Sequence, residues 1–312
     1  MLYLCENNYS YKYNILIYFK ESDHSYRLDN PIDGELCISA TTLLEIYKNP
    51  FNAKFWSWYK ALQRILKMDK DTFKKHLAKN YYFRFDEDFD KITHIAECHG
   101  ISLDEMKLYQ NIIKAEWKKK NTNSTDKGTH FHNYEEGTII KNKGLEYNGE
   151  YARLATESDD LSLLHDPYNV RIYPELRMYN RKYRVSGTAD KVFIFPDRTF
   201  HIDDWKTGEK IDEESYRHKK MLYPLQHLDD CNANHYKIQV SIYAYYLECF
   251  GYIPGDLQFT HVELAEDNIT ILNRKVYVTH YMKKEVVDML THFDNNREAL
   301  LAKHKLYKES LK

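Results

Sequence analysis

The spacing of hydrophobic and polar positions changes along this chain, and its first part reads as strands followed by a helix. Residues 12–38 alternate between apolar and polar side chains in two runs separated by turn residues, which predicts a short β-hairpin. Ser39 is then a suitable N-cap for a helix through Tyr47. The pair Asn49-Pro50 would end that helix, because proline cannot continue it.

The next segment has helical spacing. Residues 51–120 repeat apolar side chains at helical intervals, and Ser102 with Glu105 forms a capping box ahead of a helix that reaches Trp117. The segment 118–128 (KKKNTNSTDKG) is polar throughout and is expected to be a loop. An aromatic stripe in the first of these helices is expected to pack in a core, although such rings can also stack on bases; it comprises Phe55, Trp56 and Tyr59.

From residue 128 onward the chain alternates between helical and strand patterns. We expect a short helix, three strands, a long helix over 235–248, further strands over about 256–280 and a final charged helix from about 282. This order is typical of an α/β protein. It predicts a mixed central β-sheet of roughly four to six strands flanked by helices, with a helical N-terminal elaboration.

The expected organisation has three segments within one compact unit. An N-terminal hairpin and helical elaboration would span 1–125, a core would span 126–280, and a C-terminal helix would span 281–312. A chain of 312 residues is long enough to bury a large core.

Composition excludes several classes of protein. The net charge of −2 gives no global signal for nucleic acid, so contact with DNA would need a local groove. The five cysteines are scattered without a CxxC pair, which supports neither a zinc ribbon nor a disulfide framework.

Nothing in the sequence points to a membrane or to secretion. No apolar stretch approaches the roughly 20 residues needed to span a bilayer. The first residues, MLYLCENNYSYKY, carry an early Glu and lack a basic region and a long apolar run, so no secretory signal is expected. We expect a soluble, cytoplasmic protein without a membrane partner.

The strongest chemical signal is DDWKTGEK at 203–210. In a strand, Asp204 and Lys206 share one face and form an acid–base pair, while Asp203 points to the other face unless a bulge exchanges the two aspartates. Asp190, in SGTAD, is expected to end a neighbouring strand. Two carboxylates beside a lysine are suited to holding a divalent cation and activating water against a phosphodiester.

Two further sequence elements supply candidates for the same site. His132 and Glu136 are four positions apart on the helix expected to begin near 128, so they lie on one face as a ligand and its orienting partner, or as a surface pair. His130 is the rival ligand, on another side of that helix. Glu175, in YPELRMYN, is on the first of the three strands and either faces the same pocket or is exposed.

The long helix supplies a candidate polar pair. Gln239 and Tyr243 are also four positions apart, and Gln239 lies among apolar residues. A buried amide needs hydrogen-bond partners, which the site lysine or a phosphate oxygen would provide. A tyrosine-rich helix that packs on a sheet also explains the pattern.

The order of these motifs resembles a known family. His132-xxx-Glu136, Glu175, GTAD ending at Asp190, Asp204-Trp-Lys206 and Gln239-xxx-Tyr243 resemble the ordered motifs of the RecB-like branch of the PD-(D/E)XK nuclease superfamily. The similarity spans about residues 115–250 and is greatest to phage and mitochondrial single-strand DNA exonucleases. Many of these exonucleases have an iron–sulfur cluster that is held by one early cysteine and three later cysteines. The three later cysteines are missing here, so no cluster is expected.

The resemblance implies a role for each site residue. His132, Asp190 and Asp204 would hold Mg²⁺ or Mn²⁺ with the Trp205 backbone carbonyl, and Glu175 would position water or a second metal. Lys206 would act mainly by stabilising charge. The substrate and the lysine would be oriented by Glu136, Thr207, Gln239 and Tyr243.

The resemblance also implies the fold and the function. It predicts a restriction-endonuclease-like core, with residues 51–120 as an arch for a free single-stranded end. The expected activity is a metal-dependent DNA exonuclease on single-stranded ends in replication, recombination or end processing. The alternatives are an endonuclease or duplex-specific exonuclease of the same chemistry, and a nucleic-acid-binding or assembly protein with a vestigial site.

Partners and setting follow from the same resemblance. The chain has no phosphate-binding GxxxxGK[ST] loop, so a helicase or single-strand-binding partner would be a separate protein. For a phage protein, the cytoplasm would be that of the bacterial host.

Overall fold

Tertiary contacts divide the chain into two compact units, each described here by itself. The computed structural model describes residues 3–5, 17–20, 25–28, 34–83, 87–155 and 166–311. The core unit consists of Met1–Asn49 and Lys127–His304, and the helical unit of Pro50–Asp126 and Lys305–Lys312. This division differs from the three predicted segments, because the N-terminal strands and most of the last helix belong with the sheet.

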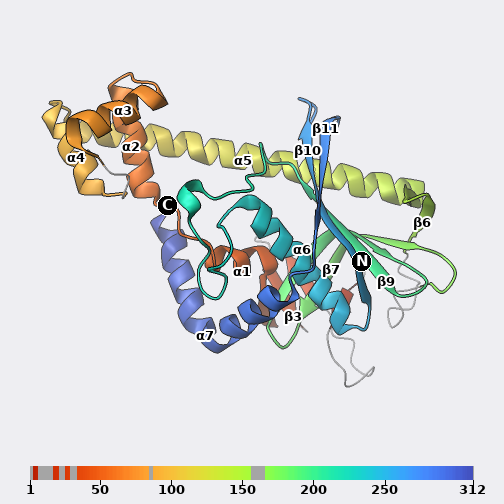
Figure 1. The fold of residues 1–312 in the computed structure, drawn as a ribbon. Coiled ribbons are helices and arrows are strands. Elements are labelled where there is room, and N and C mark those ends of the chain that lie inside the picture. Colours follow the sequence, from red (N-terminus) through yellow and green to blue (C-terminus); the bar gives the residue numbers. More distant parts are fainter. Residues whose placement is uncertain are drawn as a thin grey trace. The chain divides into compact units, whose positions relative to one another are not determined.

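Strands and helices follow one another in groups along the described chain (Figure 1). The strands are β1 (Tyr3–Cys5), β2 (Ile17–Lys20), β3 (Ser25–Leu28), β4 (Glu35–Ser39), β5 (Gly144–Tyr147), β6 (Glu150–Leu154), β7 (Arg171–Asn180), β8 (Val185–Ile194), β9 (Thr199–Lys206), β10 (Ile253–Leu264) and β11 (Ile271–Thr279). The helices are α1 (Ala40–Ile46), α2 (Ala53–Ile65), α3 (Lys70–Tyr81), α4 (Phe89–Cys98), α5 (Leu103–Asn142), η1 (Tyr216–His218), α6 (Asn232–Cys249) and α7 (Lys283–Ser310).

The mixed sheet is larger than predicted. In the described part of the chain it has 11 strands, of which β11-β10-β9-β8-β4-β3-β2 form one path, while β7 lies along the other edge of β8 and carries β1 and the β5–β6 hairpin. The prediction of four to six strands was wrong because the N-terminal strands join the same sheet. The hairpin expected at 12–38 is present as β2–β3, although parts of it lie outside the described residues.

Strand β8 changes partner halfway along one edge. It pairs with β9 from Lys191 to Ile194, and with β4 only at Val185 and Ser186. Beyond its last pair with β8, strand β9 continues beside β10 alone. The sheet is therefore split between β8 and β9, and the split begins next to Asp190 and Asp204.

Helices cover both faces of the sheet in the core unit. Apolar side chains of α1, α6 and α7 pack with those of β7 to β10 in one large core. On the other face, Phe131 of α5 packs against Trp205 and Val262, and Ile139 packs near Ile172 and Phe193. The predicted α/β architecture, with helices on the sheet, is confirmed.

Helix α5 is much longer than the sequence pattern suggested. It runs without a break for 40 residues, about 60 Å. The loop predicted at 118–128 and the helix start predicted near 128 were both wrong. Residues 118–126 are all exposed and polar, but they include no proline or glycine to end the helix. The predicted cap is correct: the Glu105 N–H donates to Ser102 Oγ at 3.2 Å.

The aromatic stripe of α2 packs inside the helical unit. Phe55 and Tyr59 are buried with residues of α3 and α4, and Trp56 packs against them. This confirms the core-packing interpretation rather than base stacking. The Ser39 cap of α1 is also confirmed, since the Thr42 N–H donates to Ser39 Oγ at 3.0 Å. None of the described helices combines the length and apolar character needed to cross a bilayer.

Candidate metal centre

Strand β9 places its two aspartates on opposite faces. Asp204 lies with Lys206 on the face covered by α6, and the two side chains form an ion pair. Asp203 points the other way, where Lys191 Nζ lies 2.5 Å from one of its carboxylate oxygens and Thr260 Oγ1 donates to the other at 2.7 Å. The alternation predicted for this strand is confirmed, with no bulge that exchanges the two aspartates.

Glu175 and Asp190 face each other across β7 and β8 at an irregularity of the sheet. The pairs Pro174↔Lys191 and Leu176↔Ala189 flank them, and Glu175 itself has a φ of 47°. A left-handed φ is unfavourable for a non-glycine residue and is found preferentially at functional sites, where the surrounding structure maintains it. Asp190 lies inside β8, so the prediction that it ends this strand was wrong.

The alternation of both strands shifts at this pair. On β7, the odd-numbered Tyr173 lies in the large core before Glu175, whereas the even-numbered Leu176 and Met178 lie in it afterwards. On β8, Ala189 lies in the same core before Asp190, and Val192 lies in it afterwards, so the alternation again shifts by one residue. Because Glu175 and Asp190 are directly opposed in the register of β7 and β8, their carboxylates lie beside each other at this point of the sheet.

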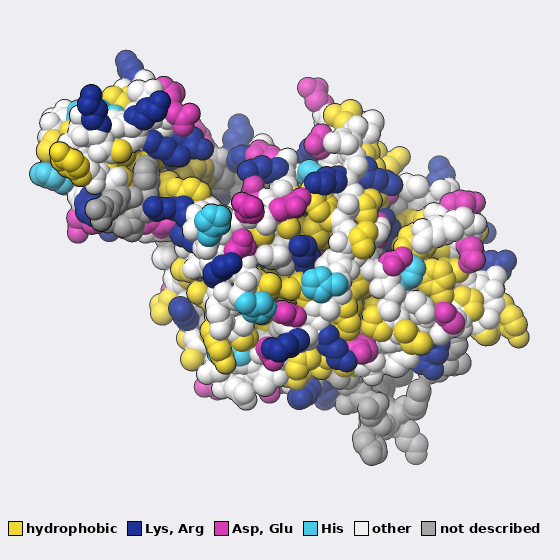
Figure 2. Space-filling model, in the orientation of Figure 1, with side chains coloured by type: hydrophobic (Ala, Val, Ile, Leu, Met, Phe, Trp, Pro, Cys, Tyr) yellow, Lys and Arg dark blue, Asp and Glu magenta, His cyan; other side chains and the backbone are white. Residues whose placement is uncertain are grey.

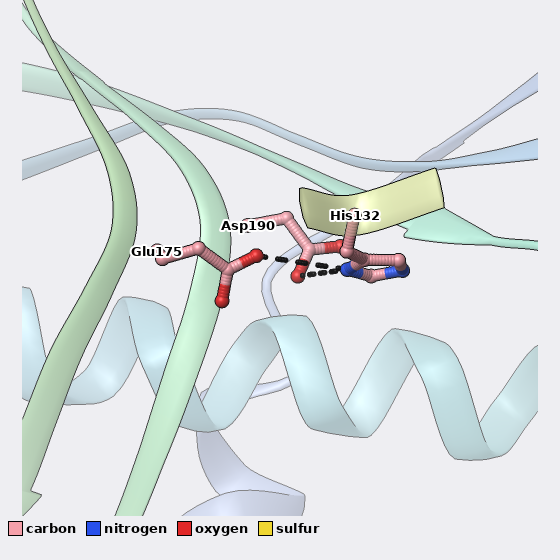
Figure 3. A group of neighbouring side chains, drawn as sticks. All are labelled: His132, Glu175 and Asp190. Carbon is pink, nitrogen blue, oxygen red and sulfur yellow. Dashed lines mark ion pairs between the residues drawn. The ribbon is translucent and has the colours of Figure 1, made fainter. Parts of the chain in front are cut away.

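Helix α5 adds an imidazole to the two carboxylates (Figure 3). His132 Nδ1 lies 3.2 Å from Asp190 Oδ1 and 3.6 Å from Glu175 Oε1. One donor atom of each of the three residues lies within 4.8 Å of the others, and no other such group of histidine, cysteine, aspartate or glutamate occurs in the described residues. Phe131 holds this part of α5 by packing edge-on against Trp205, with ring centroids 5.4 Å apart.

Backbone hydrogen bonding connects Asp190 to β9. The Trp205 N–H donates to Asp190 Oδ2 at 2.5 Å, which bridges the two strands where the sheet is split. Asp204 is next to this bond and only 1% exposed, but it lies outside the three-residue donor group. Among the described residues, no hydrogen-bond donor with suitable geometry reaches Asp204 Oδ2, although Lys206 is in ion-pair contact with it.

Three side chains of α6 are arranged around Lys206: Gln239 and Tyr236 contact its ammonium, and Tyr243 is hydrogen-bonded to Gln239. Lys206 Nζ donates to Gln239 Oε1 at 3.2 Å, and Gln239 Nε2 donates to the Tyr243 hydroxyl at 2.8 Å. Nζ also lies 4.7 Å from the centre of the Tyr236 ring, a cation–π contact. Tyr236 was not predicted, although its position three residues before Gln239 puts it on the same helix face.

Electrostatics in the cluster favour a positive charge at its centre. Burial acts to lower the pKa of His132, but the carboxylates of Asp190 and Glu175 outweigh it and raise that pKa to about 10. Burial likewise acts to raise the pKa of Asp190, yet His132 and Lys206 hold it below its ordinary value. Without a metal, a protonated His132 therefore takes the place of a cation between the two carboxylates.

The remaining charged groups respond to burial and to one another. Burial, and then the charge of Asp190, raise the pKa of Asp204 to about 6. Burial also raises the pKa of Glu175, with His132 opposing it. Burial acts to lower the pKa of Lys206, but Asp204 and Asp190 outweigh it, so the lysine stays charged.

The other predicted residues lie at varying distances from the cluster. Glu136 is close enough to Glu175 for its charge to add slightly to the increase that burial causes in the pKa of Glu175. Thr207 Oγ1 lies beside Gly128 of α5, 3.2 Å from where a Cβ of that glycine would be. The Trp205 peptide is next to Asp190 through its N–H. His130 is instead near Asp267 of the β10–β11 turn.

One face of the molecule is mixed in charge. On the face seen in Figure 2, acidic and basic side chains are interspersed, as the net charge of −2 would suggest. Comparisons of the chain with protein-family models, with curated proteins and with solved structures found no match. The functional interpretation therefore depends on the geometry of the cluster and on the order of the motifs.

Proposed function

We propose that this chain is a metal-dependent nuclease that hydrolyses phosphodiester bonds in DNA, acting on single-stranded ends. One observation carries the proposal: His132, Glu175 and Asp190 converge within 4.8 Å from three separate elements, beside the ion pair of the buried Asp204 with Lys206. A cation-binding group next to a lysine ammonium is an arrangement suited to phosphodiester hydrolysis.

The donor set suits a hard divalent cation. Two carboxylate oxygens and one imidazole nitrogen favour Mg²⁺ or Mn²⁺, and the imidazole increases the preference for Mn²⁺. The buried Asp204 Oδ2, which has no hydrogen-bond donor with suitable geometry among the described residues, is a further oxygen for the cation or for its water. Such an ion, when bound, lowers the pKa of water and neutralises charge on a phosphate.

Lys206 would act as a charged group rather than as a base. Its pKa is raised by Asp204 and Asp190, so it keeps its proton at neutral pH and can donate to a phosphate oxygen as negative charge develops there. Gln239 and Tyr236 hold the ammonium in place. Burial raises the pKa of Glu175, which makes that carboxylate a stronger base toward a water proton than an exposed glutamate.

A cleavage assay tests the proposal. End-labelled linear single strands, linear duplex and closed circular single strands would each be incubated with Mg²⁺, Mn²⁺ or EDTA, using the wild type and Lys206→Met. We expect metal-dependent loss of the linear single strands only, and its absence in the variant.

Each other outcome selects a different activity. Cleavage of circles would indicate an endonuclease, and cleavage of linear duplex alone a duplex-specific exonuclease. The absence of metal-dependent cleavage on every substrate would refute the nuclease proposal and favour a binding or assembly protein. Equal activity of Lys206→Met would refute the assignment of the lysine.

A further inference from the structure

The helical unit contains a second cluster of potential metal ligands, formed where α3 and α4 end. His76 is on α3, Tyr81 is the last residue of that helix, and His99 is the C-cap of α4. His76 Nε2 lies 3.1 Å from His99 Nε2, and the Tyr81 hydroxyl lies 3.0 Å from the same His99 nitrogen. Two imidazole nitrogens and a phenol oxygen thus meet at one point.

We propose that His76 and His99 together bind one divalent transition-metal ion, such as Zn²⁺. A zinc ion binds imidazole nitrogen at 2.0–2.1 Å, so two ligands at a tetrahedral angle have their nitrogens about 3.3 Å apart. The observed separation of 3.1 Å is close to this value, so a change of a few tenths of an ångström would admit the ion. The contact requires one nitrogen to carry the proton, which metal binding would displace.

The surroundings of the two histidines favour a cation. The amide of Asn80 is hydrogen-bonded to His76 Nδ1, with 2.8 Å between the nitrogen atoms. If the amide rotates, its oxygen can accept the Nδ1 proton of a metal-bound imidazole, which is the usual support for such a ligand. Since α3 and α4 both end here, the partial negative charge of two helix C-termini also favours a positive ion.

The protein supplies only part of the coordination sphere. Burial, and then the nearby Cys98 thiol, raise the pKa of Tyr81, so its hydroxyl stays protonated and is a weaker ligand than the imidazoles. Cys98 Sγ lies 3.6 Å from His94 Nε2, and among the described residues it is not grouped with His76 and His99. Water would complete the coordination.

This site differs in kind from the cluster around His132. Two neutral imidazoles select borderline metals such as Zn²⁺, Co²⁺, Ni²⁺ and Cu²⁺, whereas oxygen-rich sites select Mg²⁺ and Mn²⁺. Because the two ligands come from different helices, a bound ion would link α3 to the end of α4 and stabilise the helical unit. The inference does not depend on the proposed nuclease activity.

Calorimetric titration with Zn²⁺ tests the proposal on the full chain. His132→Gln would serve as the background, with excess Mg²⁺ present, so that the first cluster does not contribute an imidazole. We expect one Zn²⁺ per chain, and binding weakened at least about tenfold when His76→Gln or His99→Gln is added. His94→Gln, on the exposed surface of α4, is the matched control and should bind as tightly as the background.

Thermal unfolding gives a second measurement. Zn²⁺ should raise the unfolding temperature of the His132→Gln background but not that of the same protein carrying His76→Gln. Zn²⁺ affinity unchanged by both His76→Gln and His99→Gln would overturn the proposal. An equal loss of affinity in His94→Gln would also overturn it, because it would assign the ion to the His94–Cys98 pair.

Discussion

Metal binding at the His132 cluster should release a proton from the protein. In the metal-free state His132 carries a positive charge, because Asp190 and Glu175 raise its pKa to about 10. A metal ion can bind only to neutral imidazole, so the proton must leave. The perturbation to make is His132→Gln, which keeps a polar atom in the cluster but removes the titrating group.

The size of the effect follows from the pKa of His132. At pH 7.5 the imidazole, with a pKa of about 10, is almost fully protonated, so each ion bound should release about one proton. The apparent affinity should therefore rise about tenfold per pH unit between pH 7.5 and 9. Asp204, with a pKa of about 6, is already ionised over this range and adds little to the slope.

Calorimetry with Mn²⁺ measures the proton release directly. Titrations in buffers of different ionisation enthalpy give the number of protons released, and titrations at several pH values give the slope of affinity. His132→Gln should bind more weakly, release almost no proton and show a nearly flat pH dependence. A wild-type protein that releases no proton, or a variant with the same slope, would show that His132 is not a ligand.

Other perturbations test the surroundings of the cluster. Lys206→Met should lower turnover by about 10²–10³-fold while metal binding, measured by calorimetry, persists. Gly187→Ala should lower the free energy of unfolding by about 1–3 kcal/mol, because its Cβ would lie 2.5 Å from a ring carbon of Tyr243, whereas Gly137→Ala on the open surface of α5 should be neutral or stabilising. Asp203→Asn should cost about 3–5 kcal/mol in chemical denaturation, because it leaves a buried lysine unpaired, and a fully stable variant would contradict this. Without metal, the pKa of His132 is raised from 6.5 to about 10, so its contribution to stability is complete below pH 6.5 and is lost as the pH rises through 10; a pH series of unfolding should show this loss in the wild type and not in His132→Gln.

Local periodicity explains which parts of the site could be predicted. On β9 the alternation is regular, so the sequence correctly put Asp204 and Lys206 on one face and Asp203 on the other. On α6 the spacing of Gln239 and Tyr243 correctly indicated a shared face. Both inferences needed only the repeat of one element.

The features that escaped prediction depend on tertiary structure. The left-handed φ of Glu175 shifts the alternation of β7, and no residue type at that position signals it. The continuity of α5 through 118–128 was missed because a fully exposed helix has no apolar face to reveal its period. The extent of the sheet was missed because β4 finds its partner far along the chain.

The pairing of β4 with β8 also has a consequence for the order of folding. The Ser186 hydroxyl donates to the Ile38 carbonyl, and 148 positions separate these residues. At about 5–20 residues per second, a ribosome needs roughly 7–30 seconds to make the intervening chain, so β4 leaves the ribosome long before its partner exists. The N-terminal strands must wait for β8, and contacts of such long range form slowly because closing the loop costs entropy. The edge of β8 beside Asp190 therefore gains β4 as its partner only once residues 185–194 have been made, long after β4 itself.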